Sequence, residues 1–303
     1  MRTPFARLAP RWFDALLNSE GLTYRLLVRK ARLCACQDAR GSGPDPSCPV
    51  CGGVGYLWED PPWEEREVEL LVPASSEEAD TRMSGPTGIL PHAWAELVGV
   101  EGPNGPVSGA RLEDGRLLLP PEAPRPALYR VRYRAPRQGR GHVQDMRLAR
   151  TWADRGEVME GDLLLTVPAQ GPDGPNPAWE VRPHDQVVLL DHRLWVQQRM
   201  VRGVREALSH PWVLEVRGAR AVLEGQEVSY PFGNAFTLSE GRVVWAPGQG
   251  PPPRTPYVLD YVAAPAYYVL ADLGHRRHIE GWRLPRRLQL RLFEAYPGRG
   301  RGT

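Results

Sequence analysis

Short apolar runs that alternate with polar residues dominate the chain from about residue 94 onwards. Gly, Pro and Asp interrupt these runs every eight to twelve residues or so, a spacing typical of a β-sandwich or β-barrel. The same alternation begins earlier, where Val68, Leu70 and Val72 are separated by Glu69 and Leu71. The pattern therefore predicts a mainly β protein.

The N-terminal segment has a different period. Six apolar residues recur there at helical spacing, which predicts a helix from about residue 5; they are Phe5, Leu8, Trp12, Phe13, Leu16 and Leu17. The continuation to residue 33, GLTYRLLVRKARL, fits a helix or a strand.

Two distant segments resemble each other. Residues 115–136 read GRLLLPPEAPRPALYRVRYRAP, and residues 241–265 read GRVVWAPGQGPPPRTPYVLDYVAAP. Each contains Gly-Arg, a short strand, a proline-rich turn, Tyr-x-x-x-Tyr and a proline. We interpret them as a duplicated hairpin, although proline-rich hairpins can also look alike by chance. Because they flank 140–210, that stretch is interpreted as an inserted small antiparallel β-barrel.

The predicted fold is thus an N-terminal helix and zinc-binding loop, β-sandwich-like modules, and an inserted barrel. The expected divisions are a helix and metal segment at 1–65, a first β module at 66–139, the barrel at 140–210, a second β module at 211–296 and a disordered tail at 297–303.

Composition narrows the classes of partner. Hydrophobic residues make up 42% of the 303 residues, and the formal net charge is only +2. Wholesale binding to nucleic acid or membrane is therefore not implied. No run of 18 apolar residues and no signal peptide is seen, so we expect an intracellular protein without a membrane partner. Abundant proline and scarce asparagine suit a thermophile or a GC-rich genome equally.

Positive charge gathers near the C-terminus. The residues are Arg276, Arg277, Arg283, Arg286, Arg287, Arg291, Arg299 and Arg301. They predict a surface that faces acidic neighbours or DNA, and the sequence does not choose between the two.

All four cysteines fall within one short segment: Cys34, Cys36, Cys48 and Cys51. The pattern is C-x-C, a loop rich in turn residues, then C-x-x-C-x-G-x-G. Two close pairs can place four thiolates around one tetrahedral Zn²⁺, and four protein ligands leave no open position for water. We therefore predict a structural zinc site.

The cysteine pattern is also compatible with chemistry other than a structural zinc site. Two disulfides are disfavoured in an intracellular chain. A redox C-x-x-C needs a thioredoxin-like βαβ context, which the pattern lacks. A chaperone zinc-ribbon repeat needs four copies of the motif, and the chain has one.

Catalytic motifs are missing from the sequence. It has no P-loop, dinucleotide-binding loop, G-x-S-x-G or H-E-x-x-H. We predict no catalytic residues, no cofactor other than zinc, and no enzymatic activity.

The cysteine segment resembles the start of structural proteins from tailed bacteriophages. The matching residues are Asp45, Pro46, Cys48, Pro49, Cys51, Gly53, Gly55, Tyr56 and Trp58. The middle segment is similar to phage head-closure (stopper) barrels. The matching residues there are Gly161, Asp162, Val167, Pro168, Asp185, Val187, Leu189 and Val196.

The resemblance implies a virion protein of the neck, made in the host cytoplasm, that joins the portal to the tail and helps retain packaged DNA. It implies a ring of 6 or 12 copies with portal and tail proteins as partners. The rival classes are a tail-tube, baseplate or collar component, and a zinc-containing nucleic-acid-binding protein.

Overall fold

The computed structural model confirms a mainly β protein. It describes residue 15 and residues 23–37, 43–45, 47–48, 50–51, 53–73, 90, 92, 94–113, 116–145, 161–171, 174–204, 206–239, 241–274, 278–279 and 282–293.

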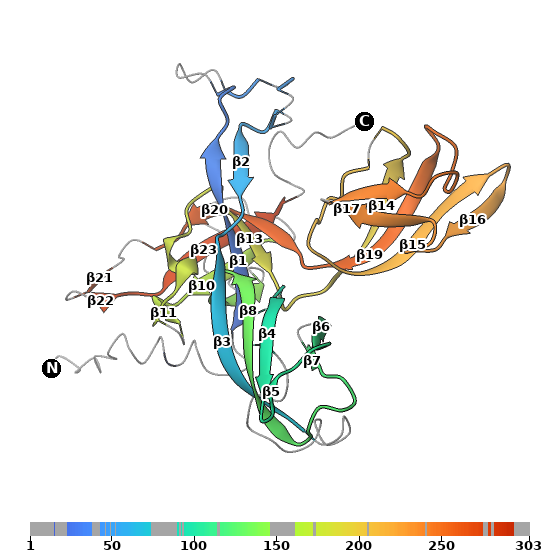
Figure 1. Cartoon of the computed structure of the whole chain (residues 1–303). Coiled ribbons are helices and arrows are strands. Elements are labelled where there is room, and N and C mark those ends of the chain that lie inside the picture. Colours follow the sequence, from blue (N-terminus) through green and yellow to red (C-terminus); the bar gives the residue numbers. More distant parts are fainter. Residues whose placement is uncertain are drawn as a thin grey trace.

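A closed antiparallel barrel of six strands forms the centre of the molecule (Figure 1). Its strands, in order around the barrel, are β1 (Tyr24–Leu33), β9 (Gln138–Asp145), β10 (Leu163–Val167), β23 (Arg286–Leu292), β20 (Ala266–Asp272) and β13 (Gln186–Leu189). The barrel closes where β13 pairs with β1, Leu26 lying opposite Leu189.

This barrel differs from the one expected within residues 140–210. Only β10 and β13 lie wholly in that range, and most of β9 does; β1, β20 and β23 come from the two ends of the chain. The apolar runs of 140–210 are too few to close a barrel, and distant strands supply the missing hydrogen-bond partners.

The predicted N-terminal helix is not supported. Tyr24–Leu33 form a strand, and apart from Ala15 and Thr23 the rest of the proposed helix lies outside the described residues. Leu26, Leu27 and Val28 are all buried, because β1 has the barrel core on one face and a second apolar cluster on the other. A strand covered on both faces has no alternation that would distinguish it from a helix.

Side chains fill the barrel. Leu165, Leu288 and Leu290 are fully buried in its core, and a 3₁₀ helix, η4 (Pro177–Glu180), adds Ala178 and Trp179 to the same cluster. Nothing larger than hydrogen fits at Gly139 without a shift, since a Cβ there would lie 2.5 Å from the Cβ of Ala178. The barrel is therefore a packed core and not a pore.

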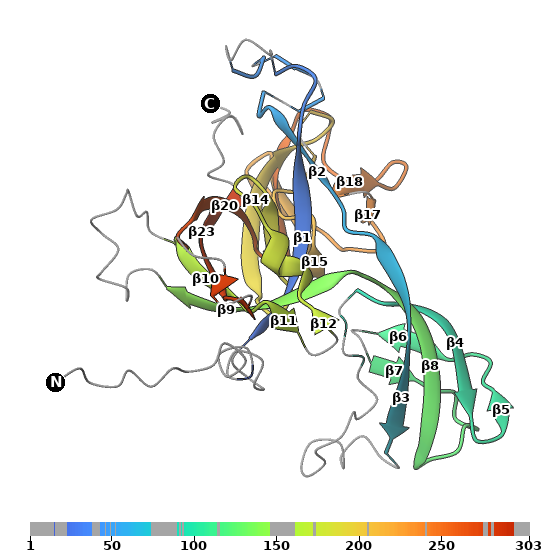
Figure 2. The same ribbon diagram turned by 90° about the vertical axis from the view of Figure 1, so that its left-hand side faces the viewer.

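Two β modules project from the barrel in different directions (Figures 1 and 2). The first contains β3 (Trp63–Val72), β4 (Glu96–Gly102), β5 (Gly105–Pro106), β6 (Arg111–Glu113), β7 (Arg116–Leu118) and β8 (Ala127–Pro136). The second contains β14 (Leu194–Val201), β15 (Val213–Leu223), β16 (Gln226–Tyr230), β17 (Phe236–Ser239), β18 (Arg242–Trp245) and β19 (Pro256–Ala263). The remaining strands are β2 (Tyr56–Glu59), β11 (Gln170–Gly171), β12 (Gly174–Pro175), β21 (His278–Ile279) and β22 (Trp282–Arg283).

The two modules have one topology. Their sheets run β3-β8-β4-β5 and β14-β19-β15-β16, and the next two strands pair separately in each, as β6–β7 and β17–β18. The repeated Tyr-x-x-x-Tyr lies on the central strand of each sheet, where all four tyrosines are buried. The similarity of the two sequence segments therefore extends to whole modules.

A β-bulge also recurs at the same position in the two modules. Strand β4 breaks register between Leu97 and Gly99, opposite the second tyrosine of the motif, and β15 breaks register between Val216 and Gly218 at the same place. A β-bulge adds one residue at a chosen position, so its recurrence with glycine in both modules indicates duplication.

The duplication also includes the barrel. The first half of the chain contains β1, the first module, β9 and β10, and the second half contains β13, the second module, β20 and β23. Within the barrel the strands of the first half are neighbours in the order β1-β9-β10, and those of the second half in the equivalent order β13-β20-β23. The sequence Leu-x-His-x-Trp precedes β4 and β15, and its tryptophans, Trp94 and Trp212, meet edge to face at 5.6 Å. Contact between equivalent residues places them beside a pseudo-twofold axis.

Candidate metal centre

The four cysteines lie at the tip of a hairpin that extends from the barrel (Figure 1). The outer half of β1 leaves the barrel and pairs with β2, Leu33 lying opposite Tyr56. The segment 34–55 joins the two strands. In the second half of the molecule only residues 190–193 join β13 to β14, so this segment is an addition to the first half.

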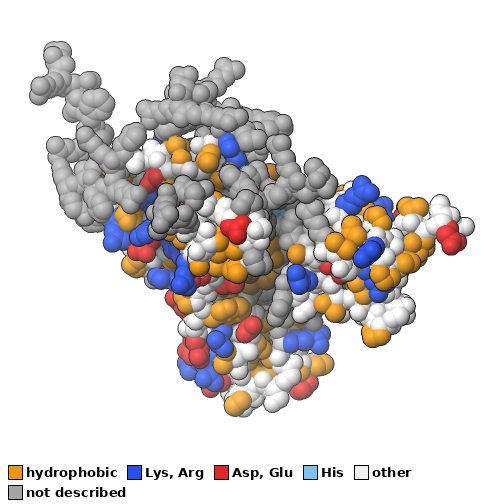
Figure 3. Space-filling model, turned by 90° about the horizontal axis from the view of Figure 1, so that it is seen from above, with side chains coloured by type: hydrophobic (Ala, Val, Ile, Leu, Met, Phe, Trp, Pro, Cys, Tyr) orange, Lys and Arg blue, Asp and Glu red, His pale blue; other side chains and the backbone are white. Residues whose placement is uncertain are grey.

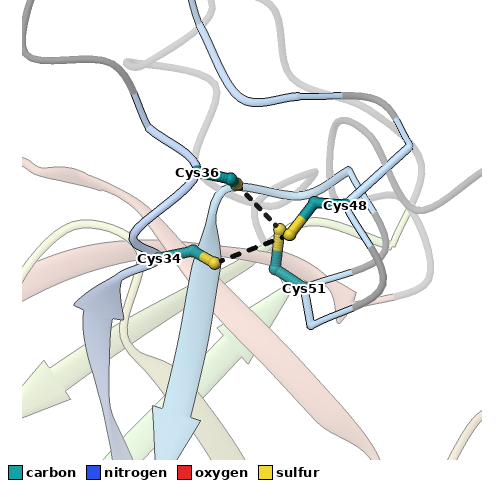
Figure 4. A group of neighbouring side chains, drawn as sticks. All are labelled: Cys34, Cys36, Cys48 and Cys51. Atoms are coloured by element: carbon teal, nitrogen blue, oxygen red, sulfur yellow. Dashed lines mark hydrogen bonds between the residues drawn. The ribbon is translucent and has the colours of Figure 1, made fainter.

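The sulfur atoms of Cys34, Cys36, Cys48 and Cys51 point toward one another (Figure 4). They all lie within 4.8 Å of one another, with 3.9 Å between Cys34 and Cys48 and 3.4 Å between Cys36 and Cys51. Four sulfurs about 2.3 Å from one tetrahedral ion are about 3.8 Å apart. The four predicted ligands therefore form a cluster compatible with a metal site.

Glycines shape the backbone around the sulfurs. Gly53 and Gly55 have φ of 83° and 82°, a left-handed conformation that favours glycine. The Gly55 amide donates to Cys51 Sγ at 3.2 Å, and its carbonyl accepts from the Cys34 amide at 2.9 Å. Gly55 thus connects one residue of each cysteine pair.

A turn positions Cys48. The Asp45 carboxylate accepts hydrogen bonds from the amide and hydroxyl of Ser47 at 2.8 and 2.7 Å, and the Asp45 carbonyl accepts from the Cys48 amide at 3.1 Å. The hydrogen bonds from Ser47 lower the pKa of Asp45, because they favour the charged carboxylate.

The clustered thiols do not titrate alike. Burial, with hydrogen bonds to the other three sulfurs, raises the pKa of Cys36 to about 12. Burial also opposes the thiolate at Cys51, but the Gly55 amide and the contacts with Cys36 and Cys48 outweigh it and lower the pKa to about 6. Cys51 therefore loses its proton more readily than Cys36 does. A bound cation would favour the deprotonated form of all four sulfurs.

No pair of these sulfurs is covalently joined. All four cysteines are free thiols, and the 3.4 Å contact is far longer than a disulfide bond of about 2.05 Å. The donor set, four sulfurs and no carboxylate or imidazole, suits a soft or borderline cation. The metal would order the hairpin tip, and with four protein ligands it would have no position for a substrate.

Contacts between the hairpin and the barrel fix the cluster in place. The Tyr56 ring stacks on His184 at 4.5 Å, and Trp58 Nε1 donates to the His184 carbonyl at 2.9 Å. The buried Asp185 carboxylate accepts from the Ala31 amide at 2.8 Å as β1 leaves the barrel. Lys30, the single lysine of the chain, lies 3.3 Å from the same carboxylate.

Sequence reasoning predicted that the four cysteines come together but missed these contacts with the barrel. His184 and Asp185 belong to the other half of the chain, and nothing in the local pattern links them to Tyr56 or Trp58. The polar triplet His184-Asp185-Gln186 directly before an apolar run was the available signal, since a buried Asp at a strand start is paired with a donor.

The arginines near the C-terminus do not form one exposed surface. Arg286 is buried and donates to the carbonyls of Trp179 and Val181 and to Asp272. Arg291 makes a bidentate ion pair with the buried Asp162. These two arginines hold the barrel together, whereas Arg287 is exposed on β23. Arg276, Arg277, Arg299 and Arg301 lie outside the described residues.

Comparison with known proteins gives no identification: no protein-family model matches the chain, and no curated protein is similar to it. Within the described part of the chain, no helix has the length and apolar character needed to cross a membrane.

Proposed function

We propose that this protein is a structural component of a tailed-phage virion, located in the neck, where it joins the portal to the tail and helps retain packaged DNA. The proposal rests on the resemblance of the cysteine segment to structural proteins of tailed phages, and of the Gly-Asp and Asp-x-Val patterns to head-closure barrels. One structural observation supports it: a packed barrel carries two β modules and a hairpin with four clustered cysteines, and these extend in three directions (Figures 1 and 2). Such a shape can contact several neighbours at once.

The second module offers a surface suited to a partner. Hydrophobic and basic side chains lie close together on its visible face (Figure 3). Trp195 is 60% exposed with the Arg217 guanidinium 4.8 Å over its ring, and Phe232 is also exposed. Trp and Arg are the residues most enriched at the centres of protein interfaces. Trp212 and Trp245, by contrast, are half-buried and pack against apolar clusters, and Tyr267 is buried in the barrel core.

We propose zinc as the metal of the four cysteines, because a closed set of four thiolates is a common structural zinc site. Its role would be to fix the hairpin tip as a rigid contact. We further propose a ring of 6 or 12 copies around the virion axis, closed by head-to-tail contacts. The roles are structural, with no catalytic step.

Imaging intact particles tests the location. Antibody or gold labels against this chain, followed by a cryo-EM map of the virion, should place it between portal and tail in rotational symmetry. Density in the tail tube, baseplate or collar would support the rival structural class, and absence from purified particles would overturn any virion role.

A variant tests the proposed contact surface. Trp195→Ala removes an exposed ring, so the isolated protein should fold normally while its assembly onto portal-containing heads falls. Val222→Ala, another exposed position in the same module, is the matched control. Equal assembly by both variants would contradict the use of this surface.

A further inference from the structure

A cavity of about 230 Å³ lies where the first module joins the barrel. We name it the junction pocket. Its lining comes from the barrel strands β1 and β9, the start of module strand β3, and the loop that carries β11, β12 and η4. The polar and charged residues among those that line it are Arg25, Glu64, Arg66, His92, Arg137, Gln138, Arg140 and Asn176.

Among the described residues that line the junction pocket, positive charge exceeds negative charge. Glu64 is the one carboxylate of that set, and two arginines share it: Arg66 at 2.7 Å and Arg137 at 3.5 Å. Arg25 is held by Asp191, which accepts from its Nε and Nη2 at 2.8 and 2.6 Å. Within the described part of the chain, these two carboxylates, Glu64 and Asp191, thus bind three of the four guanidinium groups.

The fourth arginine, Arg140, has no carboxylate partner among the described residues. It lies directly opposite Arg25 in the pairing of β1 with β9. Like charges at opposed positions destabilise a strand pair, and Asp191 neutralises only one of them. A bound anion would relieve this repulsion.

The second half of the molecule shows that the fold does not require these charges. The position equivalent to the Arg25–Arg140 pair is the pairing of Gln186 with Tyr268 on β13 and β20. Both pairs stand at the same point of the duplicated barrel, yet the second pair is uncharged.

The same holds for the module side of the junction pocket. Arg66 lies opposite the second tyrosine of its module's motif, and Val196 lies opposite the matching tyrosine of the other module. Two residues earlier on each strand, Glu64 corresponds to Leu194. The two halves thus share one fold, but only the first has these arginines at the compared positions. The fold itself therefore does not require the concentration of arginines in the junction pocket.

We propose that the junction pocket binds a phosphate-class oxyanion, with Arg140 and Arg137 as the contacting residues and Arg25 and Arg66 adding to the positive field. A guanidinium presents parallel N–H donors that match two oxygens of a phosphate. Inorganic phosphate and a backbone phosphate of DNA share this chemistry. The proposal does not depend on a location in a virion.

The test is titration of the full-length protein with inorganic phosphate by calorimetry at low salt. We expect Arg140→Gln to weaken phosphate binding about 10- to 100-fold, the value of one hydrogen-bonded contact to a charged group. Arg130→Gln, which removes a charge from an exposed position of the first module, is the matched control and should bind as the unaltered protein does. Arg140→Lys should recover part of the affinity.

A second arm separates the two sources of phosphate. Binding of a labelled DNA duplex is followed by fluorescence anisotropy, with phosphate as competitor and sulfate in parallel. If DNA uses the pocket, Arg140→Gln weakens duplex binding and phosphate competes; if not, only the calorimetric effect is seen, and the ligand is a free oxyanion.

The result that would overturn the proposal is equal phosphate affinity in the unaltered protein and Arg140→Gln, or no binding at millimolar phosphate. Circular dichroism checks that each variant is folded. If Arg140→Gln does not fold, Arg137→Gln takes its place, because that side chain is about half exposed and its loss leaves Glu64 paired with Arg66.

Discussion

The ion pair between Asp162 and Arg291 allows a sharp test of how the barrel is held closed. Asp162 is 1% exposed and accepts hydrogen bonds from Arg291 Nε and Nη2 at 2.9 Å each and from Gln289 Nε2 at 3.0 Å. These bonds tie the start of β10 to β23. Asp162→Asn keeps the shape of the side chain but removes the carboxylate charge that binds Arg291, whose side chain is only 13% exposed.

The expected loss is large. Removing one partner of a buried ion pair costs roughly 3–5 kcal/mol. Asp191→Asn is the matched control, because Asp191 also binds an arginine bidentately, but the side chains of Arg25 and Asp191 are 30% and 28% exposed. Solvent screens such a pair, so its loss should cost about 1 kcal/mol.

Chemical unfolding followed by circular dichroism gives the two free-energy differences. Amide hydrogen exchange gives a local measure, and protection in β10 and β23 should fall by about 100-fold or more in Asp162→Asn. A double variant, Asp162→Leu with Arg291→Met, should recover much of the stability, because it removes both charges.

Equal losses for Asp162→Asn and Asp191→Asn would refute the reasoning, since burial would then not decide the strength of the pair. Failure of the double variant to recover stability would show that packing around Asp162, and not its charge, is what matters.

Three further predictions concern the hairpin. Metal analysis should find about one zinc ion per chain. Cys48→Ser should abolish zinc binding and speed amide exchange in β2, while the barrel stays protected. A zinc-free protein with disulfides between these cysteines would contradict the zinc prediction. Gly55→Ala should weaken metal binding, because its Cβ would lie 2.9 Å from Pro44 Cβ at a φ of 82°, whereas Gly43→Ala, with open space around it, should have less effect on the metal. Burial lowers the pKa of His184 despite the opposing effect of Asp185, so the unfolded state binds protons more readily. The stacking on Tyr56 should therefore contribute full stability above pH about 6.5 and lose it as the pH falls below that value. Protection factors in β2, corrected for the pH dependence of intrinsic amide exchange, that stay the same between pH 7.5 and 5 would contradict this.

The cluster of four cysteines could be predicted because its chemistry is local. Cys34, Cys36, Cys48 and Cys51 lie on one short loop, and their spacing alone restricts what they can bind. The repeated Tyr-x-x-x-Tyr was visible for a similar reason, since both copies fill the same buried positions on a central strand. The alternation of apolar and polar residues likewise indicated β structure.

The barrel could not be predicted in this way. Its closure depends on β1 pairing with β13 and β10 pairing with β23, strands more than 100 residues apart. Periodicity reports which face of a segment is buried but not which distant segment covers it.

Tertiary structure also decided the identity of β1 and the charge of the junction pocket. The run Leu26-Leu27-Val28 fits a helix equally well until partners cover both of its faces. Arg25, Arg66 and Arg140 are far apart in a sequence with many arginines, and they become a site only because the module returns to the barrel beside β9. Local spacing determined the cluster of four cysteines, whereas long-range strand pairing determined which charges meet.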